Sequence, residues 1–327
     1  MAAPGPLRVA AWLLLAAVLA AVVVVWRDPW LLVRGEFARQ RIAAGLSQDR
    51  VIVAGHRWVY AEREAQSPGA PTIVMLHGFT GSKENWYPLA KALDGRYHLL
   101  IPDLPGWGES ERKPGAEYGF SQQAGHVAAF LRARSPGKPV VLLGHSMGGG
   151  IAALTAARHP ELVARVGLLD AAGVRFKDNQ FGIDVLAGKN PFAVEDAASL
   201  QRYIDIVFHR EQAKPFLPWP ASAALVDKRR ADAAFEQGVL DRIGRSSESM
   251  LPGEQARRIR QPTLLLWCRQ DAVIDSSAMA LYAQRIPQAR QVLLDDCGHM
   301  SLMERPRDVA AAVVALVDDG QPRQDER

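Results

Sequence analysis

A strand, a sharp turn and a helix are predicted around one serine, and this feature constrains the fold more than any other. The apolar run 140–143 has the composition of a buried strand, and 151–157 that of a helix. Between them, 144–148 has the pattern G-x-S-x-G with Ser146 at its centre. Such a turn holds its serine in a strained, exposed conformation, so Ser146 is a candidate nucleophile. The N–H group of Met147, at the start of the new helix, is a candidate donor to an oxyanion.

A nucleophilic serine needs a general base, a group that orients the base and a second oxyanion donor. The predicted strand 72–76 leads into a glycine-bearing loop, whose Phe79 N–H is the candidate second donor. His77 lies in the same loop, and we expect it to brace the loop rather than act on the substrate. The last predicted strand, 291–294, is followed by His299, the candidate base.

Two aspartates are candidates for the acid that orients His299. Asp271 follows the predicted strand 263–267, which precedes the strand of the base, and Asp170 follows the earlier strand 166–169. We predict that Asp271 accepts the imidazole N–H and stabilises the imidazolium formed when the serine loses its proton. Asp170 is the alternative, because some enzymes of this kind place the acid one strand earlier.

Together these segments resemble an α/β-hydrolase, from about residue 51 to residue 317. The resemblance is carried by five motifs in the order that the family requires: 76–79 (LHGF), 103–108 (DLPGWG), 144–149 (GHSMGG), 267–271 (WCRQD) and 297–299 (CGH). Epoxide hydrolases and haloalkane dehalogenases share the framework but attack with an aspartate, which Ser146 argues against. The N-terminal apolar segment, 178–181 (DNQF) and 303–306 (MERP) make the chain most similar to membrane-anchored monoacylglycerol lipases and bacterial phospholipase A enzymes.

The apolar periodicity of 51–172 and 256–318 predicts alternating strands and helices, and hence an eight-stranded, mostly parallel sheet. Strand C-termini then share one edge, where ligands bind in open α/β sheets. Residues 173–255 interrupt this alternation and are predicted to form a helical cap, and 319–327 to form a flexible tail. Three aromatic residues of the cap are tentative substrate-binding residues: Phe208, Phe216 and Trp219. The alternatives are that these side chains contact the membrane surface or pack in the cap's own core.

Eighteen apolar residues without a charge, 9–26, span roughly 27 Å as a helix, close to the thickness of a bilayer's hydrocarbon core. No small-x-small cleavage site follows, so 1–28 is predicted to be a single-pass anchor in a bacterial inner membrane rather than a signal peptide. Residues 29–50 are predicted to form an amphipathic or linker helix. The arginines after the span favour a cytoplasmic domain, whereas similarity to the bacterial phospholipases implies a periplasmic one. The sequence therefore does not assign the domain to one side of the membrane.

The composition of the chain excludes several classes of binding partner and cofactor. The net charge is +4, and the positive residues are scattered apart from 27–41 and 228–230. The chain has no concentrated basic stripe with a recognition motif, which argues against nucleic-acid binding. The chain has no phosphate-binding loop or metal-ligand pattern, so neither a cofactor nor a metal is expected. Its two cysteines, Cys268 and Cys297, are too few for a disulfide framework. We expect two free thiols, although both cysteines follow neighbouring predicted strands and a bond between them is geometrically conceivable.

These features predict a serine hydrolase that cleaves a carboxylic ester in a lipid through an acyl-enzyme, with monoacylglycerol and phospholipid both open as substrates. A second hypothesis keeps the same catalytic residues but directs them at a small soluble ester or a C–C bond. A third is a non-catalytic binding protein on this fold.

Overall fold

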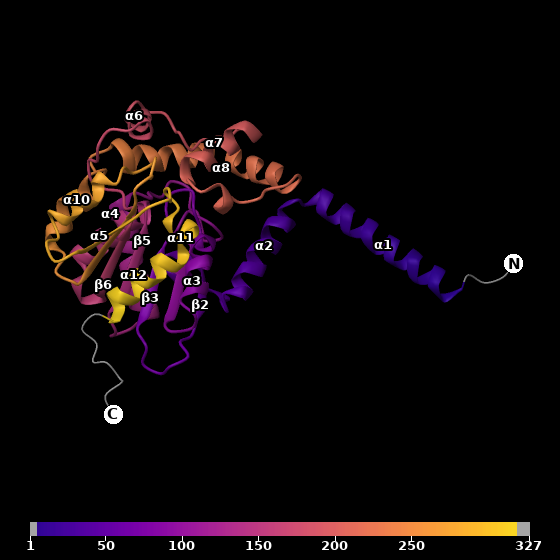
Figure 1. Cartoon of the computed structure of the whole chain (residues 1–327), viewed down its shortest axis with the longest axis horizontal. Coiled ribbons are helices and arrows are strands. Elements are labelled where there is room, and N and C mark those ends of the chain that lie inside the picture. Colours follow the sequence, from indigo (N-terminus) through magenta and orange to yellow (C-terminus); the bar gives the residue numbers. More distant parts are fainter. Residues whose placement is uncertain (1–4, 319–327) are drawn as a thin grey trace.

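Eight strands form one sheet in the order β1-β2-β4-β3-β5-β6-β7-β8 in the computed structural model, which describes residues 5–318 (Figure 1). The strands are β1 (Ser47–Val53), β2 (His56–Arg63), β3 (Thr72–Leu76), β4 (His98–Pro102), β5 (Val140–His145), β6 (Val163–Leu169), β7 (Thr263–Cys268) and β8 (Arg290–Leu294). The β1–β2 and β2–β4 pairs are antiparallel, and the remaining pairs are parallel. The predicted eight-stranded, mostly parallel sheet is confirmed. The predicted tail, 319–327, lies outside the described residues.

Helices cover both faces of the sheet, which is why the central strands are apolar on both sides. Along β3, Val74 and Leu76 pack toward one face, and Ile73 and Met75 toward the other. The first face is covered by α4 (Phe120–Arg134), α5 (Met147–Arg158) and α10 (Ser277–Ala283), and the second by α3 (Tyr87–Ala92), α11 (Ser301–Glu304) and α12 (Pro306–Asp318).

The segment between β6 and β7 forms a helical cap over the carboxyl edge of the sheet (Figure 1). It contains α6 (Gln180–Leu186), α7 (Ala197–Val207), α8 (Ala221–Arg245) and α9 (Leu251–Gln255). Short 3₁₀ helices complete the described elements: η1 (Lys83–Trp86), η2 (Pro160–Leu162), η3 (Glu211–Ala213) and η4 (Ala256–Arg258). Within 173–255, helical periodicity in the sequence is clear over 221–230, and α8 continues past it to residue 245. Beyond that point Phe235 packs on Trp107 and Tyr118 of the core, and Leu240 and Ile243 line the cavity with Ser146, so these apolar side chains serve contacts outside the helix's own segment.

A disulfide joins Cys268 to Cys297, with their Cα atoms 5.3 Å apart, so the expectation of two free thiols is wrong. The reason lies in strand register. Cys268 is the last residue of β7 and pairs with Leu294, the last residue of the parallel strand β8. Because Cys297 follows Leu294 by only three residues, the two loops leave the sheet side by side.

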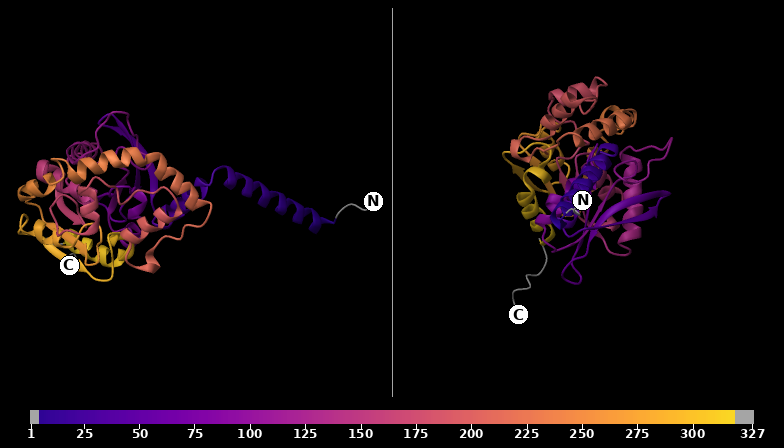
Figure 2. Two further views of the ribbon diagram at one scale, coloured as in Figure 1. Left: turned by 90° about the horizontal axis from the view of Figure 1, so that it is seen from above. Right: turned by 90° about the vertical axis from the view of Figure 1, so that its right-hand side faces the viewer.

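Two helices precede the sheet. The 22-residue α1 (Pro6–Arg27) has a mean hydropathy of 2.7 over an 18-residue window, and none of that window is buried. Among the described residues it is the one helix long and apolar enough to cross a membrane. Figures 1 and 2 show it projecting away from the remainder of the molecule. After a sharp bend, α2 (Trp30–Ala43) returns to the domain and packs near α3 and α8, with Val33 buried.

Candidate active site

Ser146 lies at the tip of a tight turn between β5 and α5, with backbone angles φ 54° and ψ −120°. Such positive φ is strained for a residue with a side chain, and it presents the serine above the strand end. The turn depends on glycines. A Cβ on Gly144 would lie 2.1 Å from the carbonyl oxygen of Gly148, and a Cβ on Gly148 would lie 2.3 Å from that of Leu76. Strand and helix approach so closely here that no side chain fits between them.

The loops after β7 and β8 bring Asp271 and His299 together. The Nδ1 atom of His299 lies 2.8 Å from Oδ2 of Asp271, and both side chains are buried. The other carboxylate oxygen accepts the backbone N–H groups of Val273 (2.8 Å) and Ile274 (2.9 Å). The carboxylate is therefore held from three sides, which fixes the imidazole ring with Nδ1 as the donor.

Burial lowers the pKa of His299 to about 3, against a smaller opposing effect of Glu304. Burial also raises the pKa of Asp271, while its two backbone hydrogen bonds favour the ionised carboxylate. The ring of His299 is thus neutral at ordinary pH. With Nδ1 donating to Asp271, Nε2 retains the lone pair that a general base requires.

Asp170, the alternative acid, does not contact His299. One of its oxygens accepts the backbone N–H of Cys268 at 3.0 Å, and the other accepts the hydroxyl of Ser301. These bonds tie the end of β6 to the end of β7 and to the start of α11. The geometry therefore gives Asp170 a bracing position and pairs Asp271 with the imidazole.

His145 links the serine turn to the histidine loop, a role that the sequence did not suggest. Its Nε2 donates to the carbonyl oxygen of His299 at 2.7 Å, and the two rings lie 4.8 Å apart. Within the described part of the chain no hydrogen bond joins the Ser146 hydroxyl to the His299 ring. In unliganded active sites this bond is often long and shortens when substrate binds. The available signal was the position of His145 directly beside the candidate nucleophile.

Glu304 is a second positioning residue that sequence reasoning missed. It is buried, and its Oε1 accepts the N–H of Gly298, next to the candidate base, at 2.7 Å. Its Oε2 accepts the N–H groups of His209 (3.0 Å) and Arg210 (2.7 Å) from the cap. One carboxylate thus ties the base loop to the cap, and the signal in the sequence was an acidic residue in an otherwise apolar buried segment.

The loop after β3 and the first residue of α5 each supply one candidate oxyanion donor. The N–H of Phe79 has no hydrogen-bond partner within the described residues, and Met147 is the first residue of α5, where an N–H has no preceding turn to bond. Both residues line the same cavity as Ser146. Their N–H groups are available to a ligand oxygen there.

His77 braces this loop, as the sequence predicted. Its Nδ1 bonds the carbonyl oxygen of Gly78 at 2.8 Å, and its Nε2 accepts the N–H of Leu104 at 3.0 Å. Burial lowers the pKa of His77 to about 4, which keeps the ring neutral for this donor and acceptor pattern. A Cβ on Gly78 would lie 2.9 Å from Cβ of Ser146, so the loop packs directly against the serine.

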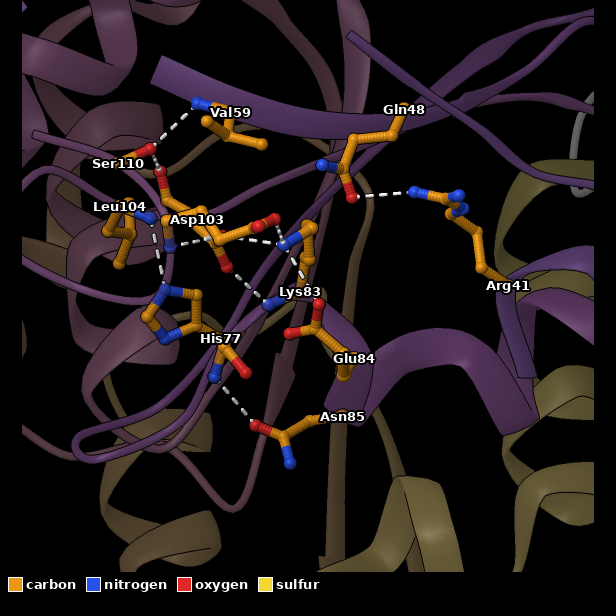
Figure 3. A network of polar contacts seen from close by, with 12 residues as sticks. Arg41, Gln48, Val59, His77, Lys83, Glu84, Asn85, Asp103, Leu104 and Ser110 are labelled. Atoms are coloured by element: carbon orange, nitrogen blue, oxygen red, sulfur yellow. Dashed lines mark hydrogen bonds and ion pairs between the residues drawn. The ribbon is translucent and has the colours of Figure 1, made fainter. Parts of the chain in front are cut away.

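A buried ion cluster supports the loop from behind (Figure 3). The ammonium group of Lys83 is inaccessible to solvent and bonds Asp103 (2.9 Å), Glu84 (2.8 Å) and Glu109 (2.7 Å). Burial acts to lower the pKa of Lys83, but the three carboxylates outweigh it and raise the pKa. Figure 3 also shows Arg41 of α2 bonding Gln48 of β1 at the edge of this cluster. Removing one partner would leave buried charge uncompensated.

A cavity of about 110 Å³ opens above Ser146, beneath the cap. Its walls are mostly apolar and come from both core and cap: Phe79, Phe181, Val185, Phe192, Leu240 and Ile243. The three tentative substrate-binding residues lie elsewhere. Phe208 is buried against the cap and core, whereas Phe216 and Trp219 are 88% and 74% exposed. After α7 ends at residue 207, the chain runs along the outer surface and carries these two side chains away from the cavity.

One group of possible metal ligands lies away from the cavity. Ligand atoms of Glu62, Glu64 and His98 lie within 4.8 Å of one another. Glu62 already bonds His98 (2.9 Å) and Arg134 (3.1 Å), so ion pairing accounts for the arrangement.

Residues 71–306 match the family described as the alpha/beta hydrolase fold, which covers more than half of the chain. The chain belongs to this α/β hydrolase family. Lipase 1 of Psychrobacter immobilis is 30% identical to this α/β hydrolase over 77% of the chain and 78% of the relative. The monoacylglycerol lipase ABHD6 of Rattus norvegicus is 30% identical over 75% and 74%. Among solved structures, a membrane phospholipase A described as a bacterial virulence factor is 34% identical with a TM-score of 0.83, covering 95% and 97%.

Proposed function

We propose that this α/β hydrolase cleaves fatty-acyl esters of lipids, with Ser146 as nucleophile, His299 as general base and Asp271 as the orienting acid. The observation that carries the proposal is the buried Asp271–His299 pair, which lies beneath a cap and beside an apolar cavity floored by a strained serine. The named activities of the similar lipases support a lipid ester as the substrate class.

The reaction follows from the geometry. His299 Nε2 accepts the hydroxyl proton of Ser146 while Oγ forms a bond to the acyl carbon, and the N–H groups of Phe79 and Met147 hold the oxyanion. As the C–O bond to the alcohol breaks, the imidazolium returns its proton to the leaving oxygen. Water then attacks the acyl-enzyme with the same base, and Ser146 recovers its proton as the fatty acid leaves.

The apolar walls of the cavity fit an acyl chain, whereas Ser146 and the two N–H groups provide its polar end. We propose monoacylglycerols and phospholipids as the two substrate groups, because the similar proteins include a monoacylglycerol lipase and a phospholipase A.

We further propose that α1 is a single-pass anchor in a bacterial inner membrane and that the catalytic domain lies in the periplasm. The disulfide between Cys268 and Cys297 supports this side, because disulfides persist in oxidising compartments and are rare in the cytoplasm. The arginines after the span favour the opposite side, but large domains are translocated largely regardless of charge. Protease added to intact spheroplasts should digest the domain, and full protection would place it in the cytoplasm.

A fluorophosphonate probe tests the catalytic proposal. It should label the wild-type protein and leave Ser146→Ala unlabelled, and the wild type should release fatty acid from monoacylglycerol, phospholipid or both. A panel that includes p-nitrophenyl butyrate and a vinylogous diketone separates lipid cleavage from small-ester or C–C cleavage. Equal labelling of the folded Ser146→Ala variant would remove the serine from the mechanism.

A further inference from the structure

We propose that the segment before α8 is a second membrane contact, in which Phe216 and Trp219 insert into the leaflet surface that α1 crosses. The partner is the lipid surface itself. This inference goes beyond the proposed hydrolysis, since it concerns how the domain rests on the membrane and does not depend on the reaction.

The exposure of these two side chains is unusual. They are 88% and 74% exposed, and among the described residues beyond α1 they are the most accessible aromatic side chains. Both side chains lie within four residues of one another on one surface segment, and exposed apolar groups that cluster mark interaction surfaces. Tryptophan and phenylalanine are also the side chains that anchor proteins at the boundary between headgroups and acyl chains.

The segment lies where the anchor leaves the domain. Trp219 stands two residues before α8, and Ala224 and Lys228 in the first turns of α8 face Arg27 and Trp30 across a small gap. Figure 1 and the left view of Figure 2 both show the start of α8 beside the bend between α1 and α2. Two segments almost two hundred residues apart in sequence therefore meet at the same end of the molecule.

The length of α1 determines where the membrane boundary falls relative to the end of the molecule that carries the start of α8. Its 22 residues span about 33 Å as a helix, slightly more than the roughly 30 Å hydrocarbon core of a bilayer. One membrane boundary therefore falls near Arg27, and the exposed Trp26 lies at that level. The first turns of α8 line a pocket with Arg27 and Trp30, and Trp219 precedes α8 by two residues, so we place Trp219 and Phe216 at the same boundary, where they extend the aromatic belt from the anchor to the cap.

Two contacts restrict the rotation of the domain about its anchor. They hold toward the leaflet a cleft of about 590 Å³ between α2 and α8, with Trp30 on one wall and Lys228 on the other. Thr80, next to the candidate oxyanion donor Phe79, is one of the residues that line this cleft. The contact thus turns toward the lipid a cleft whose lining includes the neighbour of Phe79.

An environment-sensitive label tests the contact directly on the full chain. Because the two native cysteines are paired, Phe216→Cys introduces a free thiol for the fluorophore NBD in protein reconstituted into phosphatidylethanolamine and phosphatidylglycerol vesicles. The matched controls are Ile52→Cys, 78% exposed on β1, and Ile183→Cys on α6. We expect blue-shifted emission, quenched by brominated lipid, at 216 alone. Emission at 216 that matches aqueous NBD, or quenching at 183 instead, would overturn the proposal.

Enzyme assays provide a second test that separates this proposal from the proposed function. The Phe216→Ser/Trp219→Ser variant should lose about tenfold in vesicle-lipid hydrolysis and keep wild-type turnover of soluble p-nitrophenyl butyrate, since neither side chain lines the cavity. Ile52→Ser should change neither rate. Wild-type lipid hydrolysis by the double variant contradicts the membrane contact. A wild-type protein without lipid hydrolysis contradicts the proposed function alone, and the fluorescence result then still decides the contact.

Discussion

At the scale of single residues, hydrogen-bond partners distinguish two buried aspartates that are both candidates, from the sequence, for the acid that orients His299. Asp271 faces Nδ1 of His299 at 2.8 Å, whereas Asp170 bonds the backbone of Cys268 and the hydroxyl of Ser301. An amide at 271 would present an N–H₂ group or favour the wrong imidazole tautomer. An amide at 170 still provides an acceptor for Cys268 and a donor for Ser301.

We therefore expect Asp271→Asn to reduce kcat on p-nitrophenyl butyrate by a factor on the order of a thousand, and Asp170→Asn to reduce it by less than about tenfold. Thermal melting of both variants is the control for folding. The opposite ranking in two folded variants would assign the acid to Asp170.

The pH dependence of the reaction follows from the burial of His299. The base acts only when neutral, so protonation stops the reaction as pH falls through its pKa, which burial lowers to about 3 from the ordinary 6.5. We expect kcat/KM for the soluble ester to stay level from pH 8 down to about pH 5 and to show no inflection near 6.5. Circular dichroism at each pH distinguishes loss of the base from acid unfolding. An inflection near 6.5 in folded protein would show that His299 is accessible to water in the resting enzyme.

At the scale of elements, the disulfide joins the two loops that carry the candidate acid and the candidate base. Cys268 lies three residues before Asp271, and Cys297 lies two residues before His299. Closing this loop restricts the unfolded chain, with a stabilisation of about 3–4 kcal/mol for a loop of this length. It also limits the relative movement of the two catalytic loops.

The Cys268→Ser/Cys297→Ser variant should therefore lose about 2–4 kcal/mol of unfolding free energy in urea and several-fold in kcat. Dithiothreitol should reproduce both losses in the wild type and leave the variant unchanged. If the variant melts as the wild type does, the bond contributes nothing to stability. Reductant that slows the double variant equally would point to an effect unrelated to the disulfide.

Strand positions were predictable because strict alternation of apolar runs, turns and helices leaves few ways to assemble a parallel sheet. β3 has the predicted bounds 72–76, and β6 includes the predicted 166–169. The edge strand β1 begins at residue 47, inside the range 29–50 that was predicted to be an amphipathic or linker helix. Edge strands carry polar side chains on their solvent faces, so their ends lack a hydrophobic signal.

The candidate site was predictable as far as local motifs define it. The sequence places Ser146, Asp271 and His299 at strand ends, and the structure brings Asp271 and His299 into contact. The bonds from His145 and Glu304, and the Cys268–Cys297 bond, depend on which loops become neighbours in space. The outward course of the segment before α8 depends on how the cap packs. No spacing along the chain encodes these long-range contacts.

At the scale of the whole molecule, α1 and the α/β domain meet through a single bend (Figure 2). If α1 is the anchor that we propose, it sets the distance between the candidate active site and the lipid. Enzyme tethered to the surface that holds its substrate works at a high effective concentration. A soluble ester reaches the cavity from water and gains nothing from the tether.

Deleting residues 1–28 should therefore release much of the protein from membranes and slow hydrolysis of vesicle lipid, while turnover of p-nitrophenyl butyrate survives, because Ser146, Asp271 and His299 all lie beyond the deletion. α2 and the exposed Phe216 and Trp219 should keep a fraction of the truncated protein bound, and high salt should remove little of that fraction, since apolar insertion is not screened. Fractionation of cells and the two assays measure these effects. Full-length protein found entirely in the soluble fraction would contradict anchoring, as would equal loss of both activities in a truncated form that remains folded.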